Sequence, residues 1–197
     1  MKLLFVNSCI SQRGADSRTK RLADAFLTAF RTSHPNWTVE TVSPETLLAL
    51  KPFDAEMLNE RDALCAAGRF DAPVYELARQ LQAADAVVVA APFWDLSFPA
   101  ALRTYIEYIS ANGLTYHYEA DGCHGDCAAQ WLLYLTSGGD VEQEDSVGVV
   151  YWRQLAAMLG IPVFDYVFAG GMDLDPAATE TLLSGFMGHA EALANSL

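Results

Sequence analysis

The segment from Ala83 to Tyr108 constrains the fold of this chain most strongly. Within it, Ala86–Ala91 is a short apolar run rich in valine, which is typical of a strand buried on both faces of a parallel sheet. Pro92 ends the strand, residues 93–98 (FWDLSF) form a loop, and Pro99 begins a helix, where its missing N–H costs no hydrogen bond. Strand, loop and helix in this order are typical of an α/β protein.

The alternation of strand and helix extends along the whole chain. The predicted strands are Lys2–Ser8, Trp37–Val42, Ala86–Ala91, Gln130–Thr136 and Val163–Phe168. The predicted helices begin at Ser17 and Pro99 or span Val74–Ala84, Val149–Leu159 and Pro176–Ser196. This pattern predicts the α/β class, with a doubly wound five-stranded parallel sheet and helices on both faces. Because the dinucleotide fingerprint G-x-G-x-x-G is missing, we expect the flavodoxin-like strand order.

Three segments are less regular. Residues 43–71 contain two short helical patterns, the second over Ala55–Ala67, and we expect this insert to cover the site or a partner surface. Leu114–Tyr118 reads as a short extended piece before a turn-rich stretch, and residues 140–145 read as an acidic, solvated loop.

The composition indicates one globular domain over residues 1–197. Hydrophobic residues make up 52% of the chain and charged residues 19%, which argues against disorder. No apolar run is long enough to span a bilayer. The apolar part of MKLLFVNS is too short for a signal peptide, and no cleavage site follows it, so we expect a cytoplasmic protein.

The net charge of −13 is unevenly distributed along the chain. After Arg103 the only basic residue is Arg153, against thirteen Asp or Glu. Nucleic acids and anionic membrane surfaces both require a basic face, so neither is an expected partner. Eleven of the twelve basic residues lie in the first 103 positions, where we therefore expect any phosphate to bind.

A candidate anion site lies at the start of the first long helix, at Ser17-Arg18-Thr19. Helix N-termini present free N–H groups and the positive end of a dipole, and two hydroxyls and a guanidinium add further donors here. The alternative is that Ser17 is only an N-cap.

Two loops at the expected carboxyl ends of strands can border a ligand. Phe93, Trp94 and Phe98 can form the wall of a site for a flat molecule, or pack as an ordinary cap of the sheet. Gly138 and Gly139, after Ser137, permit a close approach of the backbone to a ligand, or simply form a turn.

The run Cys123-His124-Gly125-Asp126-Cys127 admits several interpretations. Its side chains offer zinc ligands without an evident fourth member, and the two cysteines can form a disulfide or redox pair. The simplest interpretation is an ordinary loop, so the sequence assigns no metal ligand.

Several motifs together resemble the flavodoxin-like NAD(P)H quinone reductase and FMN-dependent azoreductase family. They are NSCIS at residues 7–11, Ser17-Arg18-Thr19-x-Arg21-Leu22-Ala23, APFWDLSFPAALRTYIEYI at residues 91–109, and TSGG at Thr136–Gly139. The resemblance extends over nearly the whole chain, and the block at residues 91–109 is its most specific part.

This resemblance implies a non-covalent flavin, FMN or alternatively FAD, and a homodimer with the site at the subunit interface. It places the flavin phosphate at Ser17, Arg18 and Thr19, with Ser8 nearby. It also places the flavin ring against two loops, whose residues are Pro92, Phe93, Trp94, Asp95, Leu96, Thr136, Ser137, Gly138 and Gly139. Backbone N–H groups at Asp95 and Leu96 would face the N5 edge, and Trp152 would add to the aromatic walls.

The implied activity is hydride transfer from NADH or NADPH to the flavin, followed by two-electron reduction of a quinone, azo compound or similar acceptor in a ping-pong cycle. His117 and Tyr118 are the only proton-donor candidates, with packing as the alternative role. The family commonly has Asn at the position of Asp95, where a carboxylate disfavours an anionic reduced flavin.

Two rival functions remain open at this point. A flavin-binding electron carrier that docks a basic protein partner would fit the acidic second half of the chain. A hydrolase on a similar sheet is disfavoured, because no G-x-S-x-G motif is present.

Overall fold

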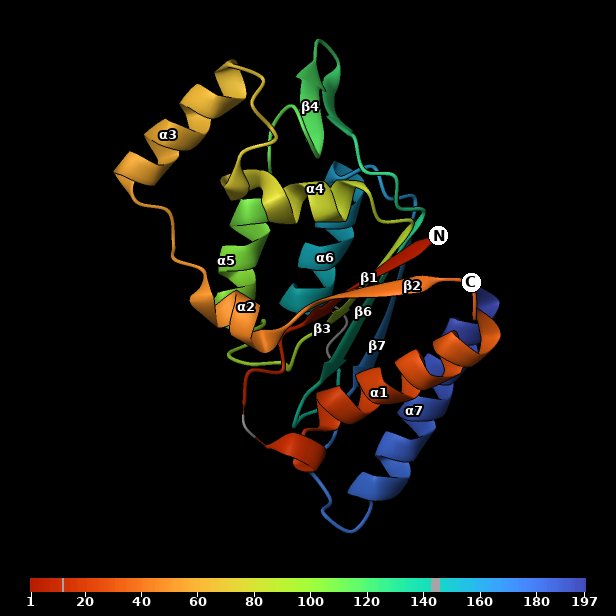
Figure 1. Cartoon of the computed structure of the whole chain (residues 1–197). Coiled ribbons are helices and arrows are strands. Elements are labelled where there is room, and N and C mark those ends of the chain that lie inside the picture. Colours follow the sequence, from red (N-terminus) through yellow and green to blue (C-terminus); the bar gives the residue numbers. More distant parts are fainter. Residues whose placement is uncertain (12, 143–145) are drawn as a thin grey trace.

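A computed structural model describes residues 1–11, 13–142 and 146–197 of the chain. Its centre is a five-stranded parallel sheet in the order β2-β1-β3-β6-β7 (Figure 1). This is the flavodoxin-like order, so the predicted fold class is confirmed. The five strands are β1 (Lys2–Asn7), β2 (Thr38–Val42), β3 (Ala86–Ala90), β6 (Trp131–Ser137) and β7 (Val163–Ala169).

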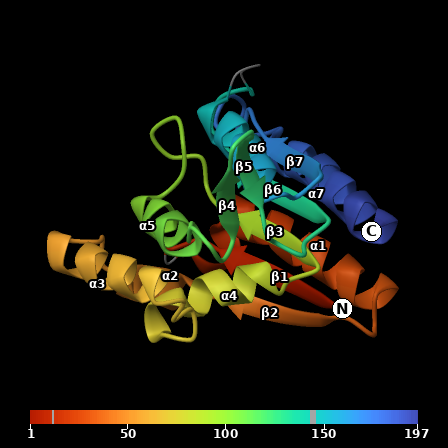
Figure 2. The same ribbon diagram turned by 90° about the horizontal axis from the view of Figure 1, so that it is seen from above.

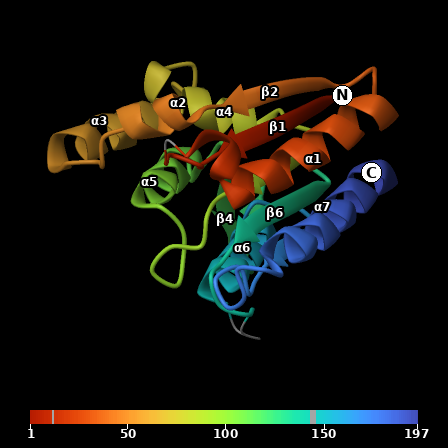
Figure 3. The ribbon, with the colours of Figure 1, turned by 90° about the horizontal axis from the view of Figure 1, so that it is seen from below.

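Helices cover both faces of this sheet, as Figures 2 and 3 show from above and below. α1 (Arg18–Ser33) and α7 (Thr179–Ser196) pack on one face. The other face carries α4 (Glu76–Gln82), α5 (Ala100–Ile109) and α6 (Val147–Met158). No helix among the described residues is long and apolar enough to cross a membrane.

The core consists of two apolar layers, one on each face of the sheet. All five residues of β3 are buried, as expected for a central parallel strand that is covered on both sides. Side chains of β3 alternate between the layers: Val87 and Val89 face α5 and α6, whereas Val88 faces α1. The central strand is thus rigidly held, and so is the start of the loop that follows it.

The insert at residues 43–71 forms α2 (Pro44–Ala49) and α3 (Ala55–Ala66). None of the twelve residues of α3 is buried, and in Figure 1 the helix projects from the body of the molecule. It leaves a large helical surface exposed.

Some predicted boundaries are wrong. The predicted helix Val74–Ala84 is a 3₁₀ turn (Pro73–Tyr75) followed by α4, because Pro73 favours a tight first turn. The last helix begins at Thr179, since Asp175 forms a turn in which its carboxylate accepts from the N–H of Ala177.

The extended piece predicted at Leu114–Tyr118 belongs to a β-hairpin that the sequence did not predict. Its antiparallel strands are β4 (Tyr116–Glu119) and β5 (Gly122–Gly125), which form a second, two-stranded sheet. Of the predicted acidic loop at residues 140–145, positions 143–145 lie outside the described residues.

Candidate active site

The loops at the carboxyl edge of the sheet are joined to one another by hydrogen bonds. The N–H of Phe93, after β3, donates to the carbonyl of Ser137 at 3.0 Å, and the N–H of Gly138 donates to the carbonyl of Ala169 at 3.0 Å. The hydroxyls of Thr19 and Ser137 lie 2.6 Å apart, which links the start of α1 to the end of β6. The β3, β6 and β7 loops and the N-terminus of α1 therefore form one connected unit.

This unit encloses a cavity of about 250 Å³. Nine of the residues predicted from the sequence to contact the cofactor line it, namely Ser17, Arg18, Thr19, Pro92, Phe93, Trp94, Ser137, Gly138 and Gly139. The structure adds Ser11, Arg13, Asp16 and Asp173, which sequence reasoning missed. No residue of the insert at 43–71 lines this cavity, so within one chain the insert does not cover it.

One end of the cavity lies at the N-terminus of α1. Ser17 is the N-cap of the helix, and its hydroxyl accepts from the N–H of Lys20 at 3.4 Å. The guanidinium of Arg18 pairs with Asp173, with 2.6 Å between Nη1 and Oδ1. Arg13 also lines the cavity. Two guanidiniums, two hydroxyls and the free N–H groups of the first helical turn form a site suited to an anion.

The aromatic loop contains a tight turn of unusual conformation. Trp94 and Ser97 are connected by two backbone hydrogen bonds, of 3.3 and 2.8 Å. Asp95 and Leu96 lie between them with φ of +50° and +66°, the left-handed region that both central residues of a type I′ turn require. Asn-Gly and Asp-Gly are the usual sequences there, and a leucine in this region is sterically disfavoured. Strain of this kind is concentrated at functional sites.

Replacing Leu96 by glycine should raise the free energy of unfolding by roughly 0.5 kcal/mol, because relief of the left-handed leucine exceeds the extra chain entropy of glycine. Leu96 is 71% exposed, so little apolar burial is lost. Urea denaturation of the cofactor-free protein measures the change. The matched control is Leu58→Gly, because Leu58 is a 40% exposed leucine inside α3. This variant should lower the free energy of unfolding by about 1 kcal/mol. Equal losses in both variants would show that Leu96 is not strained.

The Ser-Gly-Gly loop lines the cavity beside the aromatic loop. A Cβ on Gly138 would lie 3.0 Å from Phe168 and 3.3 Å from Phe93, and one on Gly139 would lie 2.4 Å from a carboxylate oxygen of Asp173. These glycines thus allow the backbone to pack tightly here.

Four residues predicted to contact the cofactor do not line the cavity. Asp95 and Leu96 are exposed at the tip of the turn. Ser8 and Thr136 are fully buried behind the wall, and the Ser8 hydroxyl has no hydrogen-bond partner among the described residues.

The prediction that Trp152 forms an aromatic wall is wrong. It is 1% exposed on α6 and stacks on Tyr134 inside the core, because its face of the helix is directed at the sheet. Phe98 is also buried, so for this residue the packing alternative is correct.

The proton-donor candidates His117 and Tyr118 lie on the β4–β5 hairpin. In Figure 1 this hairpin is at the end of the sheet opposite the N-terminus of α1. The structure therefore does not bring these side chains to the cavity of the same chain. The pKa of His117 is raised by its hydrogen bonds to Asp126 and Glu119.

All four cysteines are free thiols, so Cys123 and Cys127 form no disulfide. Burial raises the pKa of Cys127 to about 12 and that of Cys9 to about 11. Because the thiolate is the reactive form, neither side chain reacts readily at neutral pH. Cys123 is exposed at the hairpin.

The rates at which the cysteines are alkylated should follow their exposure and the pKa of each thiol. We expect iodoacetamide at pH 8 to modify Cys123 much faster than Cys9 or Cys127, whose thiolate fractions are below about 1% at that pH. Peptide mapping by mass spectrometry over time measures the rates. Urea-unfolded protein is the control, in which all three cysteines should react at similar rates; fast labelling of Cys127 in the folded protein would contradict its burial.

Comparisons with known proteins agree with this architecture. A family model described as the flavodoxin-like fold matches residues 1–193. FMN-dependent NADH:quinone oxidoreductase 2 of Clostridium acetobutylicum is 30% identical over 194 residues, covering 92% of each chain. The crystal structure of azoreductase from Bacillus anthracis str. Sterne superposes over 100% of both chains with a TM-score of 0.86 at 25% identity. An FMN-dependent NADH-azoreductase from Bacillus anthracis str. Ames Ancestor, in complex with FMN, has the same fold, with a TM-score of 0.80 at 20% identity over 98% of this chain and 99% of that one.

A parallel sheet of this order, with a cavity at its carboxyl edge, defines a flavodoxin-like protein. The chain belongs to this family, and its resemblance to the quinone reductases and azoreductases within the family is confirmed.

Proposed function

We propose that this protein is a flavin-dependent NAD(P)H oxidoreductase that reduces quinones, azo compounds or similar acceptors by two electrons. The observation that carries the proposal is the cavity at the carboxyl edge, which joins an anion site to an aromatic turn and a glycine loop. The names of the relatives in Clostridium acetobutylicum and Bacillus anthracis support the same chemistry.

The residues of the cavity fit FMN. Ser17, Arg18 and Thr19 would bind its phosphate, with Arg13 as a second positive charge. The turn at residues 94–97 and the loop at residues 137–139 would border its ring. A bound FMN supplies the redox chemistry, accepting hydride from a nicotinamide and delivering two electrons to the acceptor. FMN is preferred to FAD, because the relative in Clostridium acetobutylicum and the azoreductase from Bacillus anthracis str. Ames Ancestor are both named as FMN-dependent.

The chain's own residues orient the two substrates rather than react with them. The connected loops hold the ring edge fixed, and the aromatic side chains of Phe93 and Trp94 keep water from one side of it. No acid or base in the cavity is needed for hydride transfer. We propose a ping-pong order, in which nicotinamide leaves before the acceptor enters the same space.

We propose that two copies form the complete site. The cavity of one chain, about 250 Å³, is smaller than the roughly 300–1,000 Å³ typical of ligand sites. Apolar side chains at its rim are uncovered, with Trp94 41% and Leu96 71% exposed. Sedimentation of the FMN-loaded protein should give twice the chain mass of 21.5 kDa. A monomer that binds FMN and turns over would contradict the dimeric site.

NADH is the proposed electron donor. Recognition of the 2′-phosphate of NADPH requires an Arg or Lys, and the second half of this chain has almost none. The relative in Clostridium acetobutylicum is also named for NADH. Localisation in the cytoplasm is part of the same proposal.

The carboxylate of Asp95 should lower the reduction potential of the bound flavin. Asp95 does not line the cavity, but it follows Trp94 in the turn that would border the ring, and a negative charge at that short distance disfavours an anionic reduced flavin by roughly 1–2 kcal/mol in a partly screened site. Asp95→Asn should therefore raise the midpoint potential by about 20–40 mV for a two-electron couple. Equilibrium titration against a reference dye measures it. Asp175→Asn, an exposed carboxylate that belongs neither to the cavity nor to the turn at residues 94–97, is the control and should leave the potential unchanged.

Steady-state kinetics separates this function from that of an electron carrier. NADH oxidation by the FMN-loaded protein should be fast with a small quinone or azo dye, and double-reciprocal plots at several acceptor concentrations should be parallel. Slow NADH oxidation, together with rapid electron exchange with a protein partner, would favour the carrier.

A further inference from the structure

One face of the β4–β5 hairpin gathers side chains that can bind a metal ion. His117 and His124 are direct cross-strand partners, so both lie on the same face. Glu119 follows His117 by two residues and shares that face, whereas Cys123 and Tyr118 point to the other one. We call His117, Glu119, Asp121 and His124 the hairpin cluster.

The donor atoms of the hairpin cluster are already close. One ligand atom each from Glu119, Asp121 and His124 lie within 4.8 Å of one another. Nε2 of His124 is 2.8 Å from Oδ1 of Asp121, and Nε2 of His117 is 3.2 Å from Oε1 of Glu119. Around an ion with ligands at about 2.1 Å, tetrahedral donors lie about 3.4 Å apart. His117 is not part of this group of three: its ring stacks on that of His124, with 5.6 Å between the ring centroids, so its side chain must turn to bring Nε2 to the same ion.

The charges of the hairpin are unbalanced. Residues 116–127 contain Glu119, Asp121 and Asp126 and no Lys or Arg. In the described part of the chain, the ion pairs of these three carboxylates are formed with His117 and His124 alone. A divalent cation would neutralise this excess of negative charge.

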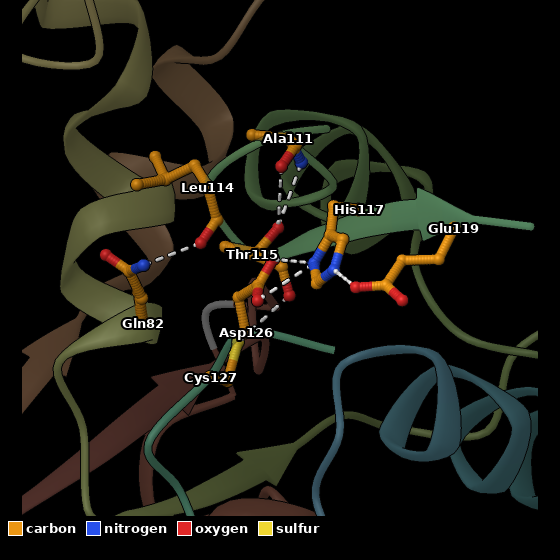
Figure 4. Close-up of polar contacts among 8 residues, drawn as sticks. All are labelled: Gln82, Ala111, Leu114, Thr115, His117, Glu119, Asp126 and Cys127. Carbon is orange, nitrogen blue, oxygen red and sulfur yellow. Dashed lines mark hydrogen bonds and ion pairs between the residues drawn. The ribbon is translucent and has the colours of Figure 1, made fainter. Parts of the chain in front are cut away.

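A further carboxylate orients one ligand. Both oxygens of Asp126 contact Nδ1 of His117, at 2.8 and 3.0 Å, on the side away from Glu119 (Figure 4). A histidine that binds a metal through one nitrogen commonly donates its other N–H to a carboxylate in this way, which fixes its tautomer and its direction. Asp126 is therefore a positioning residue, and Nε2 of His117 is left to face the cluster.

The base of the hairpin is firmly anchored. Thr115 is buried and its hydroxyl donates to the carbonyl of Ile109 at 2.7 Å, while its own carbonyl accepts from the N–H of Asp126 at 2.9 Å. Gln82 on α4 donates to the carbonyl of Leu114 at 2.7 Å (Figure 4). The ligands thus project from a fixed support, which lowers the entropy cost of binding an ion.

We propose that the hairpin cluster binds one zinc-class divalent ion per chain, through the two histidines and two carboxylates. Imidazole ligands favour zinc over calcium and magnesium, which prefer all-oxygen sites. Four protein ligands complete a tetrahedral shell, so the ion is structural. The hairpin lies at the end of the sheet opposite the α1 N-terminus, so the ion stabilises the hairpin and lies far from the cavity of its own chain.

Calorimetric titration of the tag-free, chelator-treated full chain with zinc chloride tests the proposal. We expect one ion per chain and a rise in melting temperature with zinc. His117→Gln and His124→Gln should each weaken zinc binding at least tenfold, and Asp126→Asn should weaken it about tenfold through His117. With zinc present, the His124→Gln chain should have the melting temperature of the zinc-free wild-type chain. Cobalt should bind with tetrahedral ligand-field bands and no thiolate charge-transfer band.

Two controls separate this site from adventitious binding. His189→Gln removes an exposed histidine of α7, and Cys123→Ser removes the exposed thiol of the hairpin; neither should alter the zinc affinity. Loss of binding in Cys123→Ser, equal losses in His189→Gln and His124→Gln, or saturation of the same heat signal by magnesium would each overturn the proposal.

Discussion

Reversing the charge of Arg18 should weaken FMN binding at least a hundredfold. The variant Arg18→Glu removes the charge-assisted hydrogen bond that we propose between Arg18 and the phosphate, worth about 1.5–3 kcal/mol, and adds like-charge repulsion at the same place. It also replaces the 2.6 Å ion pair with Asp173 by a pair of carboxylates, which further raises the negative potential of the cavity. Fluorescence titration of the cofactor-free protein with FMN measures the dissociation constant.

The matched control for this variant is Arg31→Glu. Arg31 lies in the last turn of the same helix, outside the cavity, and the substitution changes the net charge of the protein by the same amount. We expect FMN affinity within about threefold of the parent at moderate salt, where distant surface charges are screened. Equal losses in both variants would mean that overall charge, rather than the anion site at α1, governs binding.

Placing alanine at Gly125 should destabilise the fold by about 3 kcal/mol or more. Gly125 ends β5 where the hairpin meets the end of α6, and a Cβ there would lie 1.9 Å from the backbone nitrogen of Gly160 and 2.0 Å from the carbonyl carbon of Leu159. Backbone atoms cannot rotate away, so the hairpin must separate from α6. Urea denaturation of the cofactor-free protein measures the loss.

Gly185→Ala is the control. Gly185 lies within α7, and a Cβ added there would meet no atom within 4 Å apart from its chain neighbours and the backbone of its own helix. Alanine should therefore raise the free energy of unfolding by about 0.5–1 kcal/mol through helix propensity. A Gly125→Ala protein whose free energy of unfolding lies within about 0.5 kcal/mol of the parent value would contradict the close packing of the hairpin against the end of α6.

The sheet and the start of α1 at Ser17 were predictable because their signals are local. Ala86–Ala90 is apolar at every position, and Ser17-Arg18-Thr19 stands directly at a helix start, so hydrophobic patterning and capping chemistry suffice to place both. Five alternations of strand and helix then leave few topologies, and the parallel direction of the strands brings their carboxyl ends to one edge.

The parts that were not predictable depend on contacts between distant segments. The Arg18–Asp173 pair joins residues 155 positions apart, and no local pattern marks Asp173 as part of the cavity. The left-handed backbone at Leu96 contradicts local propensity, which favours glycine there. The β4–β5 hairpin has two strands of four residues, and the second, Gly122–Gly125, contains two glycines and no apolar alternation, so no local pattern predicts it.

The most direct test of the central claim is the visible spectrum of the protein during one redox cycle without oxygen. After incubation with FMN and removal of the free cofactor, the account predicts a yellow protein with one FMN per chain, which bleaches on addition of NADH and regains its colour with a quinone. A protein that stays colourless after incubation with FMN and with FAD would contradict the cofactor site. A yellow protein inert to both NADH and NADPH would contradict the proposed enzymatic activity.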